Sequence, residues 1–214
     1  MDGLSSIWPA TRTTIQGIPL GDAWPCAAMP KSPPAQPWET IVPFHKLTQW
    51  LCYSLMVPMT KLLNVHFAGV ELMTGLPEYR NGGLLVDTGL LTLKQADVER
   101  GLRNYHKFMD GETKAVEVVP TFEPSDDVIV EWRAVTVGFL DELLVAVNKG
   151  LGLAGPDKLT LAQMLEAGTW KVRRASLKQP DELTIDQGGR EIAQVSRPIT
   201  KGPPIGIISD GTVF

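Results

Sequence analysis

The sequence predicts a mainly helical protein that carries an extended arm at its N-terminal end. After residue 43, apolar side chains recur at helical spacing in four segments. Residues 1–43 instead hold eight of the 17 prolines and three of the six tryptophans. Proline at this density breaks helices and central strands. We therefore divide the 214 residues into an arm at 1–43 and a helical domain at 44–214.

The arm is expected to wrap the helical domain. Trp8, Trp24 and Trp38 need a surface on which to pack, and only the stretch Lys31–Pro37 reads as looser chain. The alternative is a disordered tail, although disordered segments are usually poor in aromatic residues.

The domain is expected to contain four helices. Their predicted ranges are 44–57, 93–108, 128–149 and 160–170. Pro58 is expected to end or kink the first, and Thr160 with Gln163 forms a capping box for the last. Cys52 has apolar neighbours, which favours a buried structural cysteine over a nucleophile.

The segments between the predicted helices and the C-terminal tail contain turn-forming residues. Asn81–Gly83 predicts a turn, and Leu84–Leu91 could be a buried strand or a helical turn. The tail from Gln179 is rich in polar residues, Gly and Pro, and we expect it to be irregular or β, with a turn at Ser209–Thr212.

Composition excludes several classes of function. The net charge of −4 argues against nucleic acid and membrane surfaces as partners. Two cysteines, no signal peptide and no spanning apolar stretch favour a cytoplasmic protein. The three scattered histidines predict no metal site, and the lack of phosphate-binding and dinucleotide motifs predicts no cofactor.

Two tripeptides carry the candidate chemistry. Glu78-Tyr79-Arg80 and Glu131-Trp132-Arg133 each place a carboxylate beside an aromatic ring and a guanidinium, a combination suited to sugar chemistry. The alternative is structural, because residues i and i+2 of a helix do not face each other and each could form its own salt bridge.

Asp87 is a lone acid in an apolar run. Because a buried carboxylate must be paired or neutral, Asp87 is either a partner for Arg80 or a catalytic acid with a shifted pKa.

Several long strings resemble the uracil catabolism protein 4 family (domain of unknown function 1688), its fungal members in particular. The strings are Pro43–Leu55, Leu76–Asp87, Glu131–Ala134 and Ser209–Phe214, with Trp8-Pro9 and Gly21–Pro25 in the arm. The resemblance implies a role in degrading uracil to urea, on a ribosylurea-type intermediate or its phosphate. Family chains are longer, so the resemblance also implies that an N-terminal half is missing here. The surface left by that half could then form an oligomer.

Met73–Arg80 and Glu131–Arg133 also resemble, more weakly, motifs of the queuosine salvage N-glycosidases. This similarity implies a helical DNA-glycosylase-like bundle and hydrolysis of an N-glycosidic bond. In that reading the catalytic residues are Glu78, Glu131 and Asp87, and the substrate-binding residues are Tyr79, Arg80, Trp132, Arg133, His45 and Lys46.

Two other functions stay open. The chain could be a binding or regulatory remnant that has lost turnover, or an amidohydrolase that cleaves the ureide. A pocket shared by Glu78 and Glu131 would favour the enzyme over the remnant.

Overall fold

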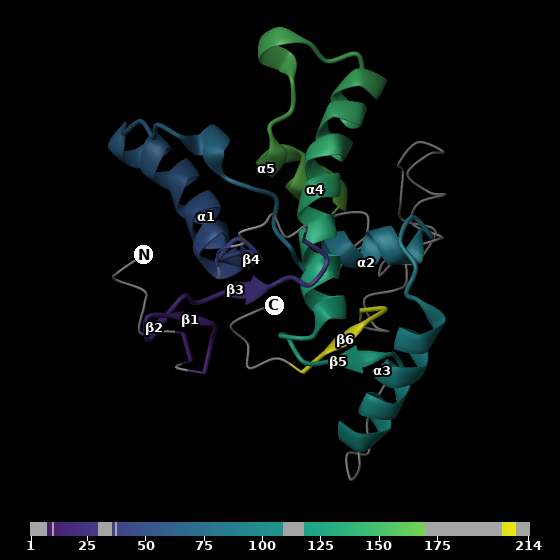
Figure 1. Cartoon of the computed structure of the whole chain (residues 1–214). Coiled ribbons are helices and arrows are strands. Elements are labelled where there is room, and N and C mark those ends of the chain that lie inside the picture. The colour runs from purple at the N-terminus through teal and green to yellow at the C-terminus, as the bar shows by residue number, and fades with distance from the viewer. Residues whose placement is uncertain are drawn as a thin grey trace.

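The computed structural model describes residues 8–9, 11–29, 36, 38–108, 118–169 and 203–208, and within them the protein is mainly helical (Figure 1). The α-helices are α1 (Lys46–Leu63), α2 (Tyr79–Asp87), α3 (Gln95–Phe108), α4 (Asp127–Gly150) and α5 (Leu161–Met164). Short 3-10 turns lie at η2 (Val70–Leu72) and η3 (Gly155–Asp157), and α5 continues as the π-helical segment η4 (Leu165–Thr169).

The strands in the described part of the chain form three two-stranded sheets. Two are antiparallel and lie in the arm, and the third is parallel: β1 (Thr14–Ile15) with β2 (Ile18–Pro19), β3 (Ala23–Pro25) with β4 (Ile41–Pro43), and β5 (Thr121–Phe122) with β6 (Gly206–Ile207). Each arm strand is only two or three residues long. Three of these four strands end in proline, which cannot donate to a sheet ladder.

Helix α4 organises the core and runs through the middle of the molecule in Figure 1. Asp126 caps it, since its side chain accepts from the Val128 amide. Each of three buried clusters contains at least one residue of α4. They are Trp24, Cys26, Phe44 and Val130; Leu76, Leu140, Met164 and Leu165; and Phe122, Ile129, Trp132 and Ile205. Burying one large apolar side chain contributes about 1.5–3 kcal/mol, so these clusters fix the arm, α5 and β5 on α4.

The tryptophans of the arm have different environments. Trp8 and Trp24 are buried, whereas Trp38 is 55% exposed. Trp24 packs with Phe44 and Val130, and Arg12 lies over its ring at 4.8 Å. The described part of the arm is thus packed on α4 through Trp24.

Helix α1 differs from the expectation for 44–57 in two ways. It begins at Lys46 and continues past Pro58 to Leu63, so the helix does not end at the proline, although an interior proline removes one backbone hydrogen bond. Cys52 is exposed and not buried, because α1 buries none of its residues.

The turn expected at Asn81–Gly83 is wrong, because these residues lie inside α2. The run Leu84–Leu91 is helical as far as Asp87, so the strand alternative is also wrong. Gly82 has a packing role: a Cβ there would lie 2.8 Å from Nε1 and Cε2 of Trp132. The glycine therefore serves close contact between α2 and α4 and does not break the helix.

The other expected helices agree more closely. The range 93–108 begins at Gln95, 128–149 corresponds to α4, and the capping box of Thr160 and Gln163 is present. The last helix, expected through Trp170, is α-helical only to Met164 and then π-helical. Trp170, the turn Ser209–Thr212 and most of the tail lie outside the described residues, as does the stretch 31–35.

Candidate functional site

Glu78 sits at the N-terminal end of α2. It is the N-cap residue, in extended conformation, and its side chain makes no cap hydrogen bond. The residue is only 7% exposed. A carboxylate held there is stabilised by the positive end of the helix dipole.

Cationic and aromatic groups surround this carboxylate. Nε of Arg80 lies 3.5 Å from Oε1 of Glu78 and donates to the hydroxyl of Tyr79 at 3.2 Å. The Arg80 guanidinium carbon is 5.5 Å from the centre of the Tyr79 ring. The first tripeptide therefore forms one local unit in which Tyr79 and Glu78 both orient Arg80.

Lys46 joins the same group of charges from the start of α1. Burial lowers the pKa of its ammonium; the charges of Glu78 and Asp22 oppose that shift, and those of Arg133 and Arg80 add to it. A lysine with a lowered pKa is a better proton donor and acceptor near neutral pH than an exposed one.

His45, the residue before α1, has an uncommon backbone. Its φ of 46° lies in the left-handed region, which non-glycine residues rarely adopt. Its amide and that of Phe44 both donate to the carbonyl of Asp22, and its ring meets that of Trp8 edge-on at 6.2 Å. Burial lowers the pKa of His45, with Asp22 acting in the opposite direction. Strained residues of this kind gather at functional sites.

The carboxylate of Asp22 joins the arm, the start of α1 and α4 through hydrogen bonds. Its carboxylate accepts two bonds of 2.7 Å from Arg133, one of 2.8 Å from the Trp24 indole and one of 3.1 Å from the Lys46 amide. Burial alone would raise the pKa of Asp22, but the hydrogen bonds and charge of Arg133, with the other donors, lower it. Arg133 is therefore held in a buried ion pair, with its guanidinium carbon 4.1 Å from the centre of the Phe44 ring.

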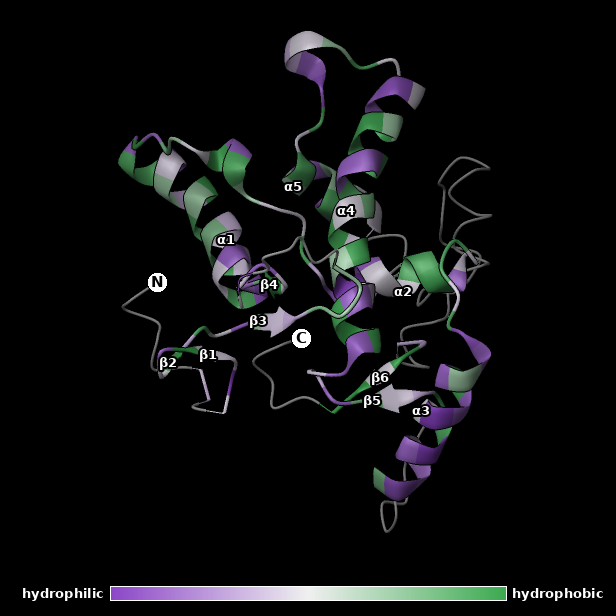
Figure 2. Ribbon diagram, in the orientation of Figure 1, coloured by the Kyte–Doolittle hydropathy of each residue, from purple (hydrophilic) through white to green (hydrophobic). Residues whose placement is uncertain are grey.

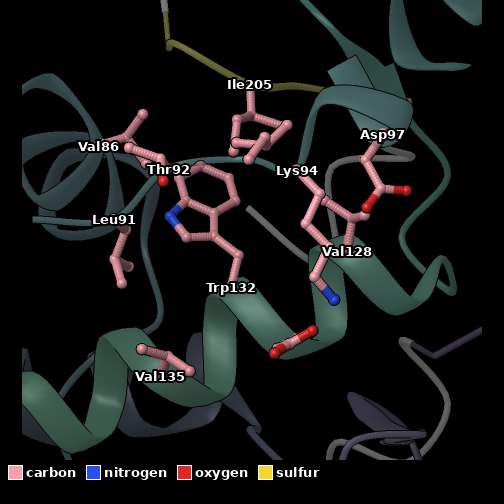
Figure 3. Close-up of a pocket in the computed structure, with 11 residues that line it drawn as sticks. Val86, Leu91, Thr92, Lys94, Asp97, Val128, Trp132, Val135 and Ile205 are labelled. Atoms are coloured by element: carbon pink, nitrogen blue, oxygen red, sulfur yellow. The ribbon is translucent and has the colours of Figure 1, made fainter. Parts of the chain in front are cut away.

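Trp132 belongs to a different pocket (Figure 3). Its indole donates to the carbonyl of Gly82 at 3.1 Å, which fixes the ring between α4 and α2. The ring lines a cavity of about 140 Å³. The other lining residues are apolar (Val86, Leu91, Leu93, Val128, Val135 and Ile205) or polar (Thr92, Lys94, Asp97 and Glu131).

The candidate residues therefore fall into separate places. Lys46, Glu78, Tyr79 and Arg80 form one group, which we call the Glu78 cluster. His45 precedes Lys46 in the chain, but its contacts are with the Trp8 ring and the Asp22 carbonyl. Glu131 is exposed and lines the Trp132 pocket, while Glu78 does not line that pocket.

Asp87 is the last residue of α2, nine positions after Glu78 and so about 13 Å further along the helix axis. The ion pair that the structure shows for Arg80 is with Glu78.

Sequence reasoning missed Asp22. The signal was present, since Asp22 is an acid between Gly21 and the Ala23-Trp24 pair of an arm expected to pack. An acid in such a segment needs a buried cation. Lys94 and Asp97 of the Trp132 pocket carried no comparable signal, because charged residues near the start of a helix are ordinary.

The described residues contain no group of three or more His, Cys, Asp or Glu side chains arranged to hold a metal ion. No helix among them is long and apolar enough to cross a lipid bilayer.

Comparison with known proteins gives matches over the whole chain. A family described as "Protein of unknown function (DUF1688)" matches residues 1–214. "Uracil catabolism protein 4" of Lachancea kluyveri is 48% identical over 216 residues, covering 100% of this chain and 44% of that protein. "Protein urg3" of Schizosaccharomyces pombe is 44% identical over 211 residues, covering 99% of this chain and 42% of that protein. The chain thus spans less than half the length of these relatives. No solved structure matches.

Proposed function

Because this chain belongs to the DUF1688 family, we propose that it acts in uracil catabolism by hydrolysing the N-glycosidic bond of a ribosylurea-type intermediate. The name of the Lachancea kluyveri relative supports the pathway. The observation that carries the chemistry is the buried carboxylate of Glu78 beside Arg80, Tyr79 and Lys46. A helical DNA-glycosylase-like fold and a cytoplasmic location belong to the same proposal.

Glu78 stabilises the developing positive charge at the anomeric carbon of the ribose. The bond from this carbon to the urea nitrogen breaks, water adds to the carbon, and the departing nitrogen takes a proton. An anion in a water-poor site lowers the energy of such a transition state more than one in bulk water. The products are urea and the free sugar, or its phosphate.

Lys46 is the proton donor in this proposal. Its charge interacts with that of Glu78, and its lowered pKa favours release of a proton. Arg80 binds an anionic group of the substrate, held in place by Tyr79.

One observation favours a second candidate, a binding module without turnover. Glu131 and Asp87, the expected second acids, lie outside the Glu78 cluster. If Lys46 cannot replace them, the chain binds the ureide and leaves it intact.

The experiment is incubation with ribosylurea, with and without a 5′-phosphate, using both this chain and the whole Lachancea kluyveri relative. Glycosidic hydrolysis releases urea and free sugar in equal amounts. An amidohydrolase would release ammonia without free sugar. Binding measured by calorimetry without any product would support the binding module and overturn the proposed hydrolysis.

A further inference from the structure

Helix α1 leaves an apolar surface uncovered. None of its 18 residues is buried. Its exposed large apolar side chains are Trp50, Leu51, Leu55, Val57, Met59, Leu62 and Leu63. Its only charged residues are Lys46 and Lys61. A surface helix normally turns a polar face to water. A helix that is apolar on most sides is therefore normally buried.

Four of these side chains form a stripe. Leu51, Leu55, Met59 and Leu62 follow one another at intervals of four, four and three residues, which places them on one face of the helix. Leu62 is 81% exposed, the largest value among them. Apolar residues recur along α1 in Figure 2, where the helix projects away from α4.

A different face of α1 holds the helix to the protein. Gln49 exchanges hydrogen bonds with Thr74, from Nε2 to Oγ1 at 2.6 Å and from the Thr74 amide to Oε1 at 2.8 Å. The Tyr53 hydroxyl donates to the Thr74 carbonyl at 3.0 Å. Tyr53 lies about 200° around the helix from Leu51. The stripe is therefore not the surface by which α1 attaches.

A groove of about 810 Å³ lies on the other side of α1, between α1, η2, α4 and the start of α5. Tyr53 and Met56 line it from α1, and none of the four stripe residues does. The stripe is therefore a separate apolar surface. Exposed apolar surface of this kind marks a contact with another polypeptide segment.

The lengths of the relatives point to the occupant. The match covers 44% of the Lachancea kluyveri protein and 42% of the Schizosaccharomyces pombe protein. For the former, with 216 aligned residues, roughly 270 residues lie outside the match. That is enough for a further domain with its own core.

We propose that the α1 stripe is the docking surface for the part of the family polypeptide that lies outside this match. The interface is apolar, and the segment that covers it presents apolar side chains to Leu55 and Leu62. This inference is independent of the reaction proposed for the Glu78 cluster.

Cysteine labelling of the folded proteins tests the proposal. In this chain, Leu62→Cys and Leu55→Cys are made one at a time with Cys52→Ser, and the rate of maleimide labelling is measured. In the whole Lachancea kluyveri relative, cysteine replaces the residues aligned with Leu62 and Leu55. Labelling is read peptide by peptide by mass spectrometry. The matched control is Glu142→Cys, at an exposed charged position of α4.

We expect labelling at the two stripe positions to be at least roughly tenfold slower in the relative than in this chain, because a covered thiol reacts only when the contact opens. The control should label at similar rates in both. Equal rates at the stripe positions would overturn the proposal. So would protection in this chain alone that rises with protein concentration, since that result would assign the surface to a second copy.

Discussion

Arg133 and Asp22, 111 positions apart in the sequence, form a fully buried ion pair with two hydrogen bonds of 2.7 Å and 0% exposure of either side chain. This pair fastens the arm to α4. Because Asp22 also binds the Lys46 amide, the same contact sets where α1 begins. The position of Lys46 beside Glu78 therefore depends on an ion pair that takes no direct part in the proposed chemistry.

Arg133→Met should lower the free energy of unfolding by about 3–5 kcal/mol, because it leaves the carboxylate of Asp22 buried without its main partner. Urea denaturation followed by circular dichroism measures the change. Arg103→Met, at an exposed position of α3, is the control and should change stability by about 0.5 kcal/mol or less. The double variant Asp22→Asn with Arg133→Met should cost less than the sum of the single changes. Additive losses would show that the pair is not a unit.

The contribution of Asp22 to stability should depend on pH. Its folded pKa lies below the ordinary value of 3.8, so its stabilising effect is present above that value and is lost as pH falls through the lower folded pKa. The difference in unfolding free energy between the wild type and Asp22→Asn should be constant near neutral pH and shrink in acid. Denaturation of both proteins from about pH 7 to about pH 2 tests this sign. A difference that grows in acid would contradict the lowered pKa.

Gly82→Ala should destabilise the protein by about 1–3 kcal/mol, because the added Cβ would lie 2.8 Å from the Trp132 ring and 2.9 Å from Oγ1 of Thr136. Gly138→Ala in α4 is the matched control, since a Cβ there meets nothing within 4 Å. Alanine at that position should stabilise by about 0.5–1 kcal/mol, as in other helix interiors. The melting temperatures of the two variants test this expectation. Equal changes in melting temperature would mean that α2 and α4 are not tightly packed.

Glu78→Gln should reduce urea release by about 10²–10³-fold if Glu78 stabilises the transition state. The change keeps the shape of the side chain and removes its charge. Activity per folded molecule and thermal stability are measured on the same sample, with Glu142→Gln as an exposed control. A loss of stability with full specific activity would falsify the catalytic role, because it would show that Glu78 serves only to hold Arg80.

The helical character of the chain could be predicted from local sequence signals alone. The apolar period and the capping residues of α4 and α5 are local signals, and both helices begin within one residue of the expected position. The Glu78-Tyr79-Arg80 unit was also local, since its contacts join neighbours in the chain.

Which candidate residues contact one another could not be predicted from the sequence, because these contacts depend on how distant segments pack. Glu131, Trp132 and Arg133 are consecutive, yet successive residues of a helix point about 100° apart. Glu131 is exposed at the Trp132 pocket and Arg133 is buried against Asp22. Gly82 was expected in a turn, whereas it lies in a helix and packs closely against Trp132. That contact could not be foreseen, because Trp132 lies 50 positions away in the sequence. A contact between two distant segments produces no hydrophobic periodicity in either segment. It therefore cannot be predicted from the local sequence and depends on how the segments pack.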